Sequence, residues 1–385
     1  MKNDINKTLS EFTDALKGCD ASVSALEKIS SEKHADDLCA HYIWENGRQS
    51  VFLCPKAEQR GTLFTNLSGA LASRPDLEEK LKSFEEADAA DPFAKELLPQ
   101  AKETVVLVIP KKMCQKREYL LDVILSEADK AAALKVFIVM EDDASGVVTV
   151  NLHSRGQSAA NRCAVVVYCS VGKHAHLVLN EVQDLGPNTV SMLRKRTVVD
   201  ESGDFHWNIC ELGSAEVCDS LDVCLAGQNS SAVIYGLYFP NKEQKMTMLT
   251  RQDHIVPHTY SNLLYKGALT GSSRADWEGM IYVDPAADKT DGYQKNENLL
   301  LSENARVNTK PGLEIVTDDV KCSHGTTVAD IDPDQVFYLT SRGIPLQEAE
   351  RLIVQGFFDT ILNLVTYSPI RGKLQEKIGM KMQEN

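Results

Sequence analysis

The sequence predicts a mainly β protein, with a core of many short strands and helical regions on either side of it. Two observations lead to this fold class. Short runs of β-branched and other apolar residues recur through residues 101–330, and turn-forming residues separate them. Helical spacing of apolar residues is found instead in residues 1–100 and 331–385. We therefore expect an N-terminal mixed region (1–100), a β core (101–330) and a C-terminal helical region (331–385).

The N-terminal region combines helices with a β-hairpin. Apolar residues at helical spacing predict a helix over residues 5–16. A second helix is expected to begin at Pro75, because proline suits the first turn and the acidic residues after it suit the positive end of the helix dipole. Between these helices, residues 41–44 and 49–53 have the pattern of two strands, and the Asn-Gly pair between them is typical of a hairpin turn.

The β core contains strands that are short and closely spaced. They begin roughly 10 to 16 residues apart, as in a sandwich, a barrel or a β-solenoid, and the spacing does not choose among the three. The clearest runs are residues 104–109, 136–140, 147–152, 164–169, 175–179, 217–225 and 232–239.

The C-terminal region predicts helices with one broad apolar face. Asp332 and Gln335 have the spacing of a capping box, with proline at the first helical position, and Gly343 is expected to end that helix. A longer helix follows from Pro345. Packing on the body of the protein is the usual fate of such a face, and docking of another protein is the alternative. The apolar face comprises Leu346, Ala349, Leu352, Ile353, Phe357, Ile361 and Leu364.

Composition and charge exclude several classes of function. The 385 residues carry a formal net charge of −14, which disfavours non-specific binding to nucleic acid or to an anionic membrane surface. The first residues lack the apolar stretch of a signal peptide, and no apolar run approaches the roughly 18 residues of a membrane span. We therefore expect a cytoplasmic protein. The ten cysteines show no two-residue spacing typical of zinc or ferredoxin sites, so most are expected to pack in the core.

Standard catalytic motifs are absent from the sequence. It has no Gly-x-x-x-x-Gly-Lys-Ser/Thr loop, so this chain should bind no nucleotide as a P-loop enzyme does. It also has no Gly-x-Ser-x-Gly elbow and no His-Glu-x-x-His helix. These absences favour a non-catalytic protein.

Three local groups of residues offer metal-binding or reactive side chains. Residues 253–258 contain two histidines four apart, but Pro257 between them disfavours the helix that a shared metal would need, so a structural role is favoured. Residues 204–207 are aromatic and are expected in the core. In the third group, Cys322 and His324 would project from the same face of a strand. A thiolate and an imidazole on one face can bind iron, although packing is the commoner role of such a pair.

The segment from Asp253 to Phe358 closely resembles the SufB/SufD family of iron–sulfur cluster assembly proteins. About 100 residues agree in order, which is more specific than a short motif. The resemblance implies a right-handed parallel β-helix, or solenoid, with helical regions at both ends. The matching pieces include Leu-Tyr-Lys-Gly (264–267), Ala-Arg-Val-Asn-Thr-Lys-Pro (305–311), Asp-Asp-Val-Lys-Cys-Ser-His-Gly (318–325) and Phe-Tyr-Leu-Thr-Ser-Arg-Gly-Ile (337–344), with residues 253–254, 257, 261, 273–274, 279–281, 289–291, 299–302 and 314–315.

Two positions indicate which of the two paralogues the chain resembles. SufB-type chains carry a scaffold cysteine just before the Leu-Leu run, where this chain has Asn296. At the later site, SufB-type chains carry Glu-His-Glu, whereas this chain has Cys322, Ser323 and His324, the SufD-type pattern. An amide cannot replace a thiolate as sulfur acceptor or iron ligand, so we expect that this chain builds no cluster alone.

The resemblance also implies partners. We expect a complex with a SufB-type paralogue and two copies of a SufC-type ABC ATPase, carrying a transient iron–sulfur cluster and accepting electrons from reduced flavin. Cys322 and His324 would face the paralogue and bind iron only in the complex. The C-terminal helices would bind the ATPase through Leu346, Leu352, Ile353, Phe357 and Ile361.

Two alternative functions remain open. The first is a homodimeric scaffold of an ancestral SufB-like kind, in which one chain plays both roles, and Asn296 argues against it. The second is a β-solenoid enzyme acting on polysaccharide. Such enzymes use clustered charged residues along a groove and many are secreted, whereas this chain shows no export signal. An isolated chain that forms a homodimer is compatible with the SufD-type expectation.

Overall fold

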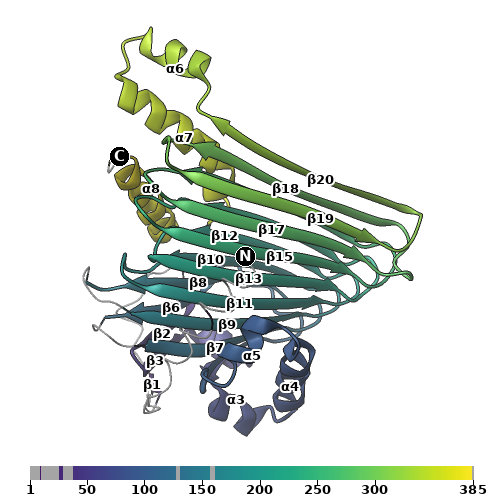
Figure 1. Ribbon diagram of the computed structural model, residues 1–385. Helices are drawn as coiled ribbons and strands as arrows, with labels where there is room; N and C mark the ends of the chain where they lie inside the picture. Colours follow the sequence, from purple (N-terminus) through teal and green to yellow (C-terminus); the bar gives the residue numbers. More distant parts are fainter. Residues whose placement is uncertain (1–8, 10–25, 29–37, 127–130, 157–160, 384–385) are drawn as a thin grey trace.

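The computed structural model describes residues 9, 26–28, 38–126, 131–156 and 161–383 and shows a parallel β-solenoid with helices at both ends (Figure 1). The predicted fold class is confirmed. The chain alternates between two sheets, so that each of about eight turns adds one strand to each sheet. The helix predicted over residues 5–16 lies outside the described residues except for Leu9.

Most strands of the two sheets pair in parallel with the strand two positions along the chain. From β5 and β6 onward, paired residues are separated by between 26 and 32 positions, as in Val190 with Glu216 and Arg274 with Arg306. The first sheet, called sheet A, has the order β1 (Glu27–Lys28), β3 (Arg48–Leu53), β2 (Leu38–Glu45), β6 (Glu118–Leu125), β8 (Ser145–Ser154), β10 (His176–Asp184), β12 (Asp204–Glu211), β14 (Ser231–Tyr238), β16 (Tyr260–Leu269), β18 (Thr290–Leu300), β20 (Val320–Asp330). The second, sheet B, has the order β19 (Arg306–Ile315), β17 (Arg274–Val283), β15 (Lys245–His254), β13 (Glu216–Leu225), β11 (Val190–Val199), β9 (Arg162–Val171), β7 (Ala131–Met140), β5 (Glu103–Ile109), β4 (Leu63–Asn66).

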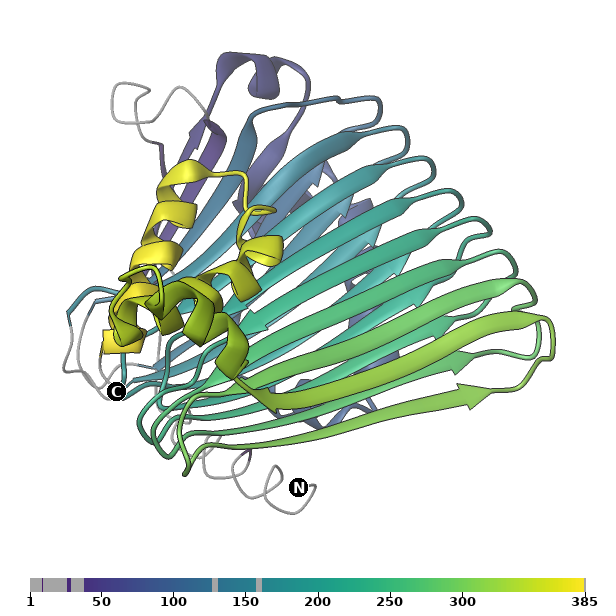
Figure 2. The same cartoon turned by 90° about the horizontal axis from the view of Figure 1, so that it is seen from above.

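Helices cover the outer faces of both sheets. The strands beneath the N-terminal helices, β5, β7 and β9, are therefore apolar on both faces along most of their length, and β5 is buried throughout. The N-terminal helices α2 (Pro55–Gln59), α3 (Leu67–Ser73), α4 (Asp76–Asp88) and α5 (Pro92–Leu97) include the one predicted after Pro75, and α4 and α5 pack on sheet B. The C-terminal helices α6 (Pro333–Thr340), α7 (Leu346–Leu362) and α8 (Ser368–Gln383) follow β20, and α7 and α8 pack on sheet A (Figure 2). No helix of the described residues combines the length and the apolar character that a bilayer span requires.

The solenoid begins earlier in the chain than the sequence pattern indicated. The predicted hairpin is present as β2 and β3, with Asn46 and Gly47 both at positive φ in its turn. β2 then pairs in parallel with β6, and β4 pairs antiparallel with β5. Strands of both sheets therefore precede residue 101. The predicted boundary at residue 101 thus falls between strands that pair with each other in the structure. The sequence pattern did not reveal this pairing, because strands some 80 residues apart in the chain leave no local signal.

One corner of the solenoid repeats the same backbone conformation in successive turns. A non-glycine residue adopts a left-handed φ of 53° to 61° at each of seven repeats, and at six of them, all but Asn229, its N–H donates to a carbonyl of the next turn. Asp143, for example, donates to Lys173 (2.8 Å), and His174 donates to Glu201 (3.0 Å). This corner ladder comprises Lys112, Asp143, His174, Ser202, Asn229, His258 and Lys289.

The space enclosed by the two sheets, the lumen, holds the main core and a buried charged group. Apolar side chains fill most of it. Near its middle, the Nζ of Lys195 lies 2.6 Å from Glu181 Oε1 and 2.9 Å from Asp219 Oδ2, with all three side chains buried. Burial alone would lower the pKa of Lys195, but the carboxylates of Asp219, Glu181 and Glu211 hold it well above its ordinary value. The lysine therefore stays charged inside the solenoid.

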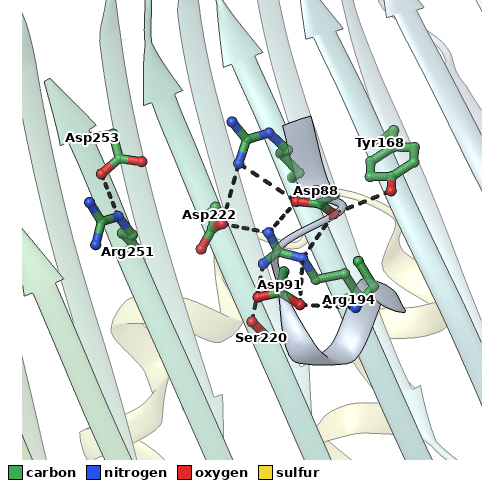
Figure 3. A network of polar contacts seen from close by, with 10 residues as sticks. Asp88, Asp91, Tyr168, Arg194, Ser220, Asp222, Arg251 and Asp253 are labelled. Atoms are coloured by element: carbon green, nitrogen blue, oxygen red, sulfur yellow. Dashed lines mark hydrogen bonds and ion pairs between the residues drawn. The ribbon is translucent and has the colours of Figure 1, made fainter. Parts of the chain in front are cut away.

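A second charged network attaches the N-terminal helices to sheet B (Figure 3). Asp88, at the end of α4, accepts hydrogen bonds from Arg194 Nε (3.0 Å) and Nη2 (2.5 Å) and from the hydroxyl of Tyr168 (3.2 Å). Arg194 also donates to Ser220 and Asp222 on the neighbouring strand β13. The side chains of Arg194 and Asp88 are both fully buried. Their pairing fixes the position of α4 relative to the sheet.

Candidate functional site

The terminal turn, formed by β19 and β20, leaves the lumen open at its C-terminal end. β19 pairs with β17 alone and β20 with β18 alone, so each strand has a free backbone edge within the described residues. β18 alternates buried and partly exposed positions, whereas most of β20 is exposed. Figure 1 shows these strands along one edge of the solenoid, with α6 and α7 beyond them. A partner could therefore reach both the strand edges and the lumen here.

Cys322 and His324 face the open end of the lumen. Residues 321–325 are extended within β20, so the two side chains share one face, and Lys321 projects from the other. Cys322 is paired with Gly292, and His324 with Gln294. Paired residues of a parallel ladder point to the same side, and Gln294 is buried in the lumen.

The surroundings of Cys322 are mostly apolar. It packs with Val320 and Leu313 on a small cluster around Ile281. Burial raises the pKa of its thiol, so Cys322 is protonated in the isolated chain. A Cβ at Gly292 would lie 3.4 Å from both the Cys322 Sγ and His254 Nε2. Because Gly292 has no side chain, the thiol of Cys322 and the imidazole of His254 border the same small space.

His254 also lies beside the candidate site, which the sequence pattern did not predict. Its Nδ1 lies 2.7 Å from Thr259 Oγ1 and its Nε2 lies 2.8 Å from Ser261 Oγ. Burial lowers its pKa to about 4, so the imidazole is neutral near pH 7. His258 instead belongs to the corner ladder, with φ 61°. The two histidines lie on different parts of the turn, in agreement with the structural role favoured for them.

The terminal turn carries two side chains, a thiol and an imidazole, of types that can bind iron. His324 is exposed, and Cys322 is partly exposed. Within the described part of the chain, no group of three or more His, Cys, Asp or Glu side chains is arranged to hold a metal ion. Iron–sulfur clusters are commonly held by four ligands. A cluster bound at Cys322 and His324 would therefore need further ligands from another molecule or from sulfide.

Asn296 is part of a hydrogen-bonded group deep in the lumen. It is fully buried; its Nδ2 donates to the hydroxyl of Tyr238 (3.1 Å), and its Oδ1 accepts from Asn298 (2.6 Å). The amide at this position is thus buried and hydrogen-bonded through both its nitrogen and its oxygen.

The predicted apolar face of α7 is divided between packing and exposure. Ile361 is fully buried against the solenoid, so its predicted contact with an ATPase is corrected to core packing. Ile353 and Phe357 are half-buried, and Lys266 Nζ lies 4.6 Å from the Phe357 ring centroid. Leu346 and Leu352 are 55% and 38% exposed. Of the five predicted residues, these two are the most accessible to a partner.

Two aromatic residues of α6 extend this exposed surface. Phe337 is 72% exposed and Tyr338 is 56% exposed, the largest exposures among the aromatic side chains of the described residues. No sequence pattern selected them as functional residues, because α6 is too short to show which of its faces a neighbour covers. We call Phe337, Tyr338, Leu346 and Leu352 the α6–α7 surface.

Comparison with known protein families decides the family. The SufBD core domain of the SUF system of iron–sulfur cluster assembly matches residues 123–357, more than half of the chain. The chain belongs to the SufBD family. Within it, the chain is SufD-like: it is 37% identical over 171 residues to the iron–sulfur cluster assembly protein SufD of Escherichia coli, covering 44% of this chain and 40% of that protein.

Two mycobacterial SufBD proteins are similar to this chain. A SufBD family protein of Mycobacterium leprae is 39% identical over 171 residues, covering 42% of this chain and 44% of that protein. One of Mycobacterium tuberculosis is 32% identical over 252 residues, covering 63% and 62%. The chain thus spans about half the length of the curated SufBD relatives that it matches.

Proposed function

We propose that this chain is a non-catalytic SufD-type scaffold subunit that joins a SufB-type paralogue through its terminal turn. The observation that carries the proposal is the open end of the lumen, where Cys322 and His324 lie between two free strand edges. A cluster assembled there would be bound by two chains at once. The cluster is the cargo of the scaffold.

The terminal turn has the properties of an incomplete interface. Free edges of β19 and β20 expose backbone donors and acceptors that a second solenoid can pair. Three apolar side chains of this turn are exposed beside them: Ile315 (38%), Val316 (54%) and Val328 (47%). Covering these groups would offset part of the cost of association. A SufB-type chain would also supply the thiol that Asn296 lacks.

In this proposal each of the two chains supplies part of the ligands of the cluster. His324 would bind iron through a neutral ring nitrogen, and Cys322 through its thiolate after loss of the proton. The remaining ligands and the sulfur-accepting thiol would come from the paralogue. Reduced flavin bound to the assembled complex is the proposed electron source.

The α6–α7 surface is the proposed docking site of a SufC-type ABC ATPase. It joins four exposed apolar side chains next to the terminal turn. The chain has no phosphate-binding loop, so ATP would act only through the partner. Dimerisation of two ATPase copies, one on each scaffold chain, would move the C-terminal helices and open the paired lumens.

Co-purification tests the proposal. The chain is co-expressed with a SufB-type paralogue and a SufC-type ATPase, and anaerobic iron and sulfide are measured on the purified complex. Val328→Glu, which places a charge on the lumen-facing side of β20, should abolish pairing with the paralogue. Ser323→Glu, on the opposite face of the same strand, is the control and should pair normally. Equal pairing by Val328→Glu and the native chain would refute the interface.

The homodimeric scaffold is tested by the same material. Native mass measurement of the isolated chain determines whether the free edges bind a second copy. If the homodimer alone assembles iron and sulfide, with no paralogue present, the chain plays both roles and the SufD-type proposal is wrong.

A further inference from the structure

Two buried cysteines are in contact at the N-terminal end of the solenoid. Cys39 lies in β2 and Cys54 directly follows β3, on opposite sides of the hairpin. Their Sγ atoms are 3.6 Å apart, and Cys39 also accepts a hydrogen bond from Gln115 (3.2 Å). Both thiols are free. No other pair of described cysteines makes such a contact.

The backbone already holds the two residues at a spacing that a disulfide accepts. The pairing of β2 with β3 ends at Ala40 and Leu53, and Cys39 lies at a register irregularity of β2. The Cys54 N–H still donates to the Cys39 carbonyl (2.9 Å) and holds the two backbones side by side. Hydrogen-bonded antiparallel pairs have Cα atoms about 5.5 Å apart, inside the roughly 4.4–6.8 Å range of disulfides. The sulfur atoms need to approach from 3.6 Å to about 2.04 Å, which side-chain rotation supplies.

We propose that Cys39 and Cys54 form a reversible dithiol–disulfide pair, oxidised by low-molecular-weight disulfides of the glutathione class. In the first step the Cys54 thiolate attacks one sulfur of the disulfide RSSR; that S–S bond breaks, RS⁻ leaves, and a mixed disulfide forms on Cys54. In the second step Cys39 loses its proton and attacks the Cys54 sulfur, releasing the second RS⁻. The two departing thiolates take up the two protons, so RSSR is reduced to two RSH while the protein dithiol is oxidised.

The roles of the two thiols follow from their positions. Cys39 is fully buried, so an external reagent does not reach it and it is suited to the second, intramolecular step; burial also raises its pKa to about 11, so its proton has to be lost in that step. Cys54 is 8% exposed and lies where β3 gives way to α2. Among the described residues, β3 is covered on its outer side only by the two-residue strand β1, which pairs with Ser50 and Val51. Local opening of such an edge costs less than global unfolding and admits the reagent.

The disulfide would change the stability of the first turn of the solenoid. In the reduced protein the hairpin is held by strand pairing and packing, whereas the oxidised protein has a covalent link across a 15-residue separation. A link of this kind restricts the unfolded chain and so favours the folded one. The pair would thus make the stability of the N-terminal end depend on the thiol–disulfide balance around the protein.

Peptide mapping of the native full chain gives a direct readout. The folded protein is equilibrated with reduced and oxidised glutathione at several ratios, quenched with acid, alkylated and digested with trypsin. Cleavage after Lys33, Arg48 and Lys56 separates the two cysteines onto peptides 34–48 and 49–56. We expect these peptides to be linked by a disulfide as the oxidised fraction increases, and to be released by dithiothreitol.

Two variants and one melting measurement complete the test. Cys54→Ser should abolish the linked peptides, whereas Cys114→Ser, which removes an exposed thiol, should leave them unchanged. The oxidised native chain should melt a few degrees above the reduced chain, and Cys54→Ser should remove that difference. The proposal is overturned if the native thiols stay reduced in fully oxidised glutathione, if Cys54 stops at the mixed disulfide, or if the link forms only after denaturation.

Discussion

At the scale of single residues, Gly292 determines the shape of the candidate site. Its missing side chain leaves space between Cys322 and His254, both 3.4 Å from where a Cβ would lie. His254 is held neutral by burial and is oriented by Thr259 and Ser261. The accessible imidazole of the terminal turn is instead that of His324, which is exposed at the lumen mouth. Iron arriving from outside would meet His324 first.

We predict that His324→Ala reduces cluster formation more than Cys322→Ser does. His324→Ala should lower iron and sulfide on the reconstituted complex by about tenfold, an effect typical of losing a group that supports a metal. Cys322→Ser should lower it less, because the raised pKa of this thiol keeps it protonated. The deficit of Cys322→Ser should increase with pH, since more of the native thiol ionises as pH rises toward its pKa.

Thermal melting of the isolated chain separates function from packing for both variants. Since His324 is exposed, His324→Ala should change the free energy of unfolding by less than about 0.5 kcal/mol. Full cluster assembly by His324→Ala would contradict the site. A large loss of stability, with assembly reduced only in proportion, would show that the residue acts in packing.

Single residues also show where the sequence was sufficient and where it was not. The shared face of Cys322 and His324 follows from strand alternation, and their selection from the family resemblance. The contact of Cys322 with the space beside His254 depends on the register of β20 on β18 and on the position of β15 in the opposite sheet. That register is set by packing of turns about 30 residues apart, which no local pattern encodes.

At the scale of elements, α7 shows why an apolar face does not by itself predict a partner. The sequence predicted its position closely, but the structure divides its predicted apolar face between buried and exposed side chains, and docking of a partner on the exposed part stays a prediction. Val354, Phe358 and Ile361 pack on sheet A, while Leu346 and Leu352 project away from it. Which residues of α7 are buried depends on where the solenoid beneath the helix ends. The sequence of the helix alone carries no information on that.

We predict that charges on the α6–α7 surface weaken binding of the ATPase without unfolding the chain. Phe337→Glu and Leu352→Glu should each lower the co-purified ATPase by at least about tenfold, if these side chains are buried at the interface. Ile361→Asp is the contrasting variant and should lower the melting temperature, because it buries a charge in the core. Unchanged ATPase binding by both surface variants would exclude this docking site.

The attachment of α4 to sheet B leads to a second prediction at this scale. Asp88→Ala removes the main partner of a fully buried guanidinium and should destabilise the protein by about 3 to 5 kcal/mol. Arg251→Ala disrupts a more exposed pair, with Asp253, farther along the same face (Figure 3), and should cost less than about 1 kcal/mol. Denaturant unfolding measures both; equal losses would show that Arg194 is satisfied by its other partners.

At the scale of the whole molecule, the solenoid is a stack in which each turn contacts mainly its two neighbours. Stability in such a stack is close to a sum over turns and their interfaces. The sequence predicted the class of fold through the family resemblance, while strand spacing alone left a sandwich and a barrel open. It did not predict that the hairpin of the N-terminal region is the first layer, since β2 pairs with β6 across some 80 residues.

We predict a gradient of hydrogen exchange along this stack. Among strands β5 to β20, amides of β19 and β20 should exchange fastest, because their outer edges are free and most of β20 is exposed. Amides of β9 and β11, buried between neighbours and beneath α5, should exchange slowest. Binding of the SufB-type paralogue should protect β19 and β20 selectively. Uniform exchange along the stack would contradict the independence of the turns.

The regular spacing of the paired strands has a consequence for how the protein is made. From β5 and β6 onward, each new strand pairs with one that left the ribosome about 30 residues earlier, so every loop to be closed is short. Synthesis at about 5–20 residues per second then delivers one turn every few seconds, and each completed turn is the template for the next. Assembly is therefore expected to proceed vectorially from the hairpin, and the terminal turn with Cys322 and His324 forms after the layers beneath it. A nascent chain would be unable to capture its partner before the rest of the solenoid has folded.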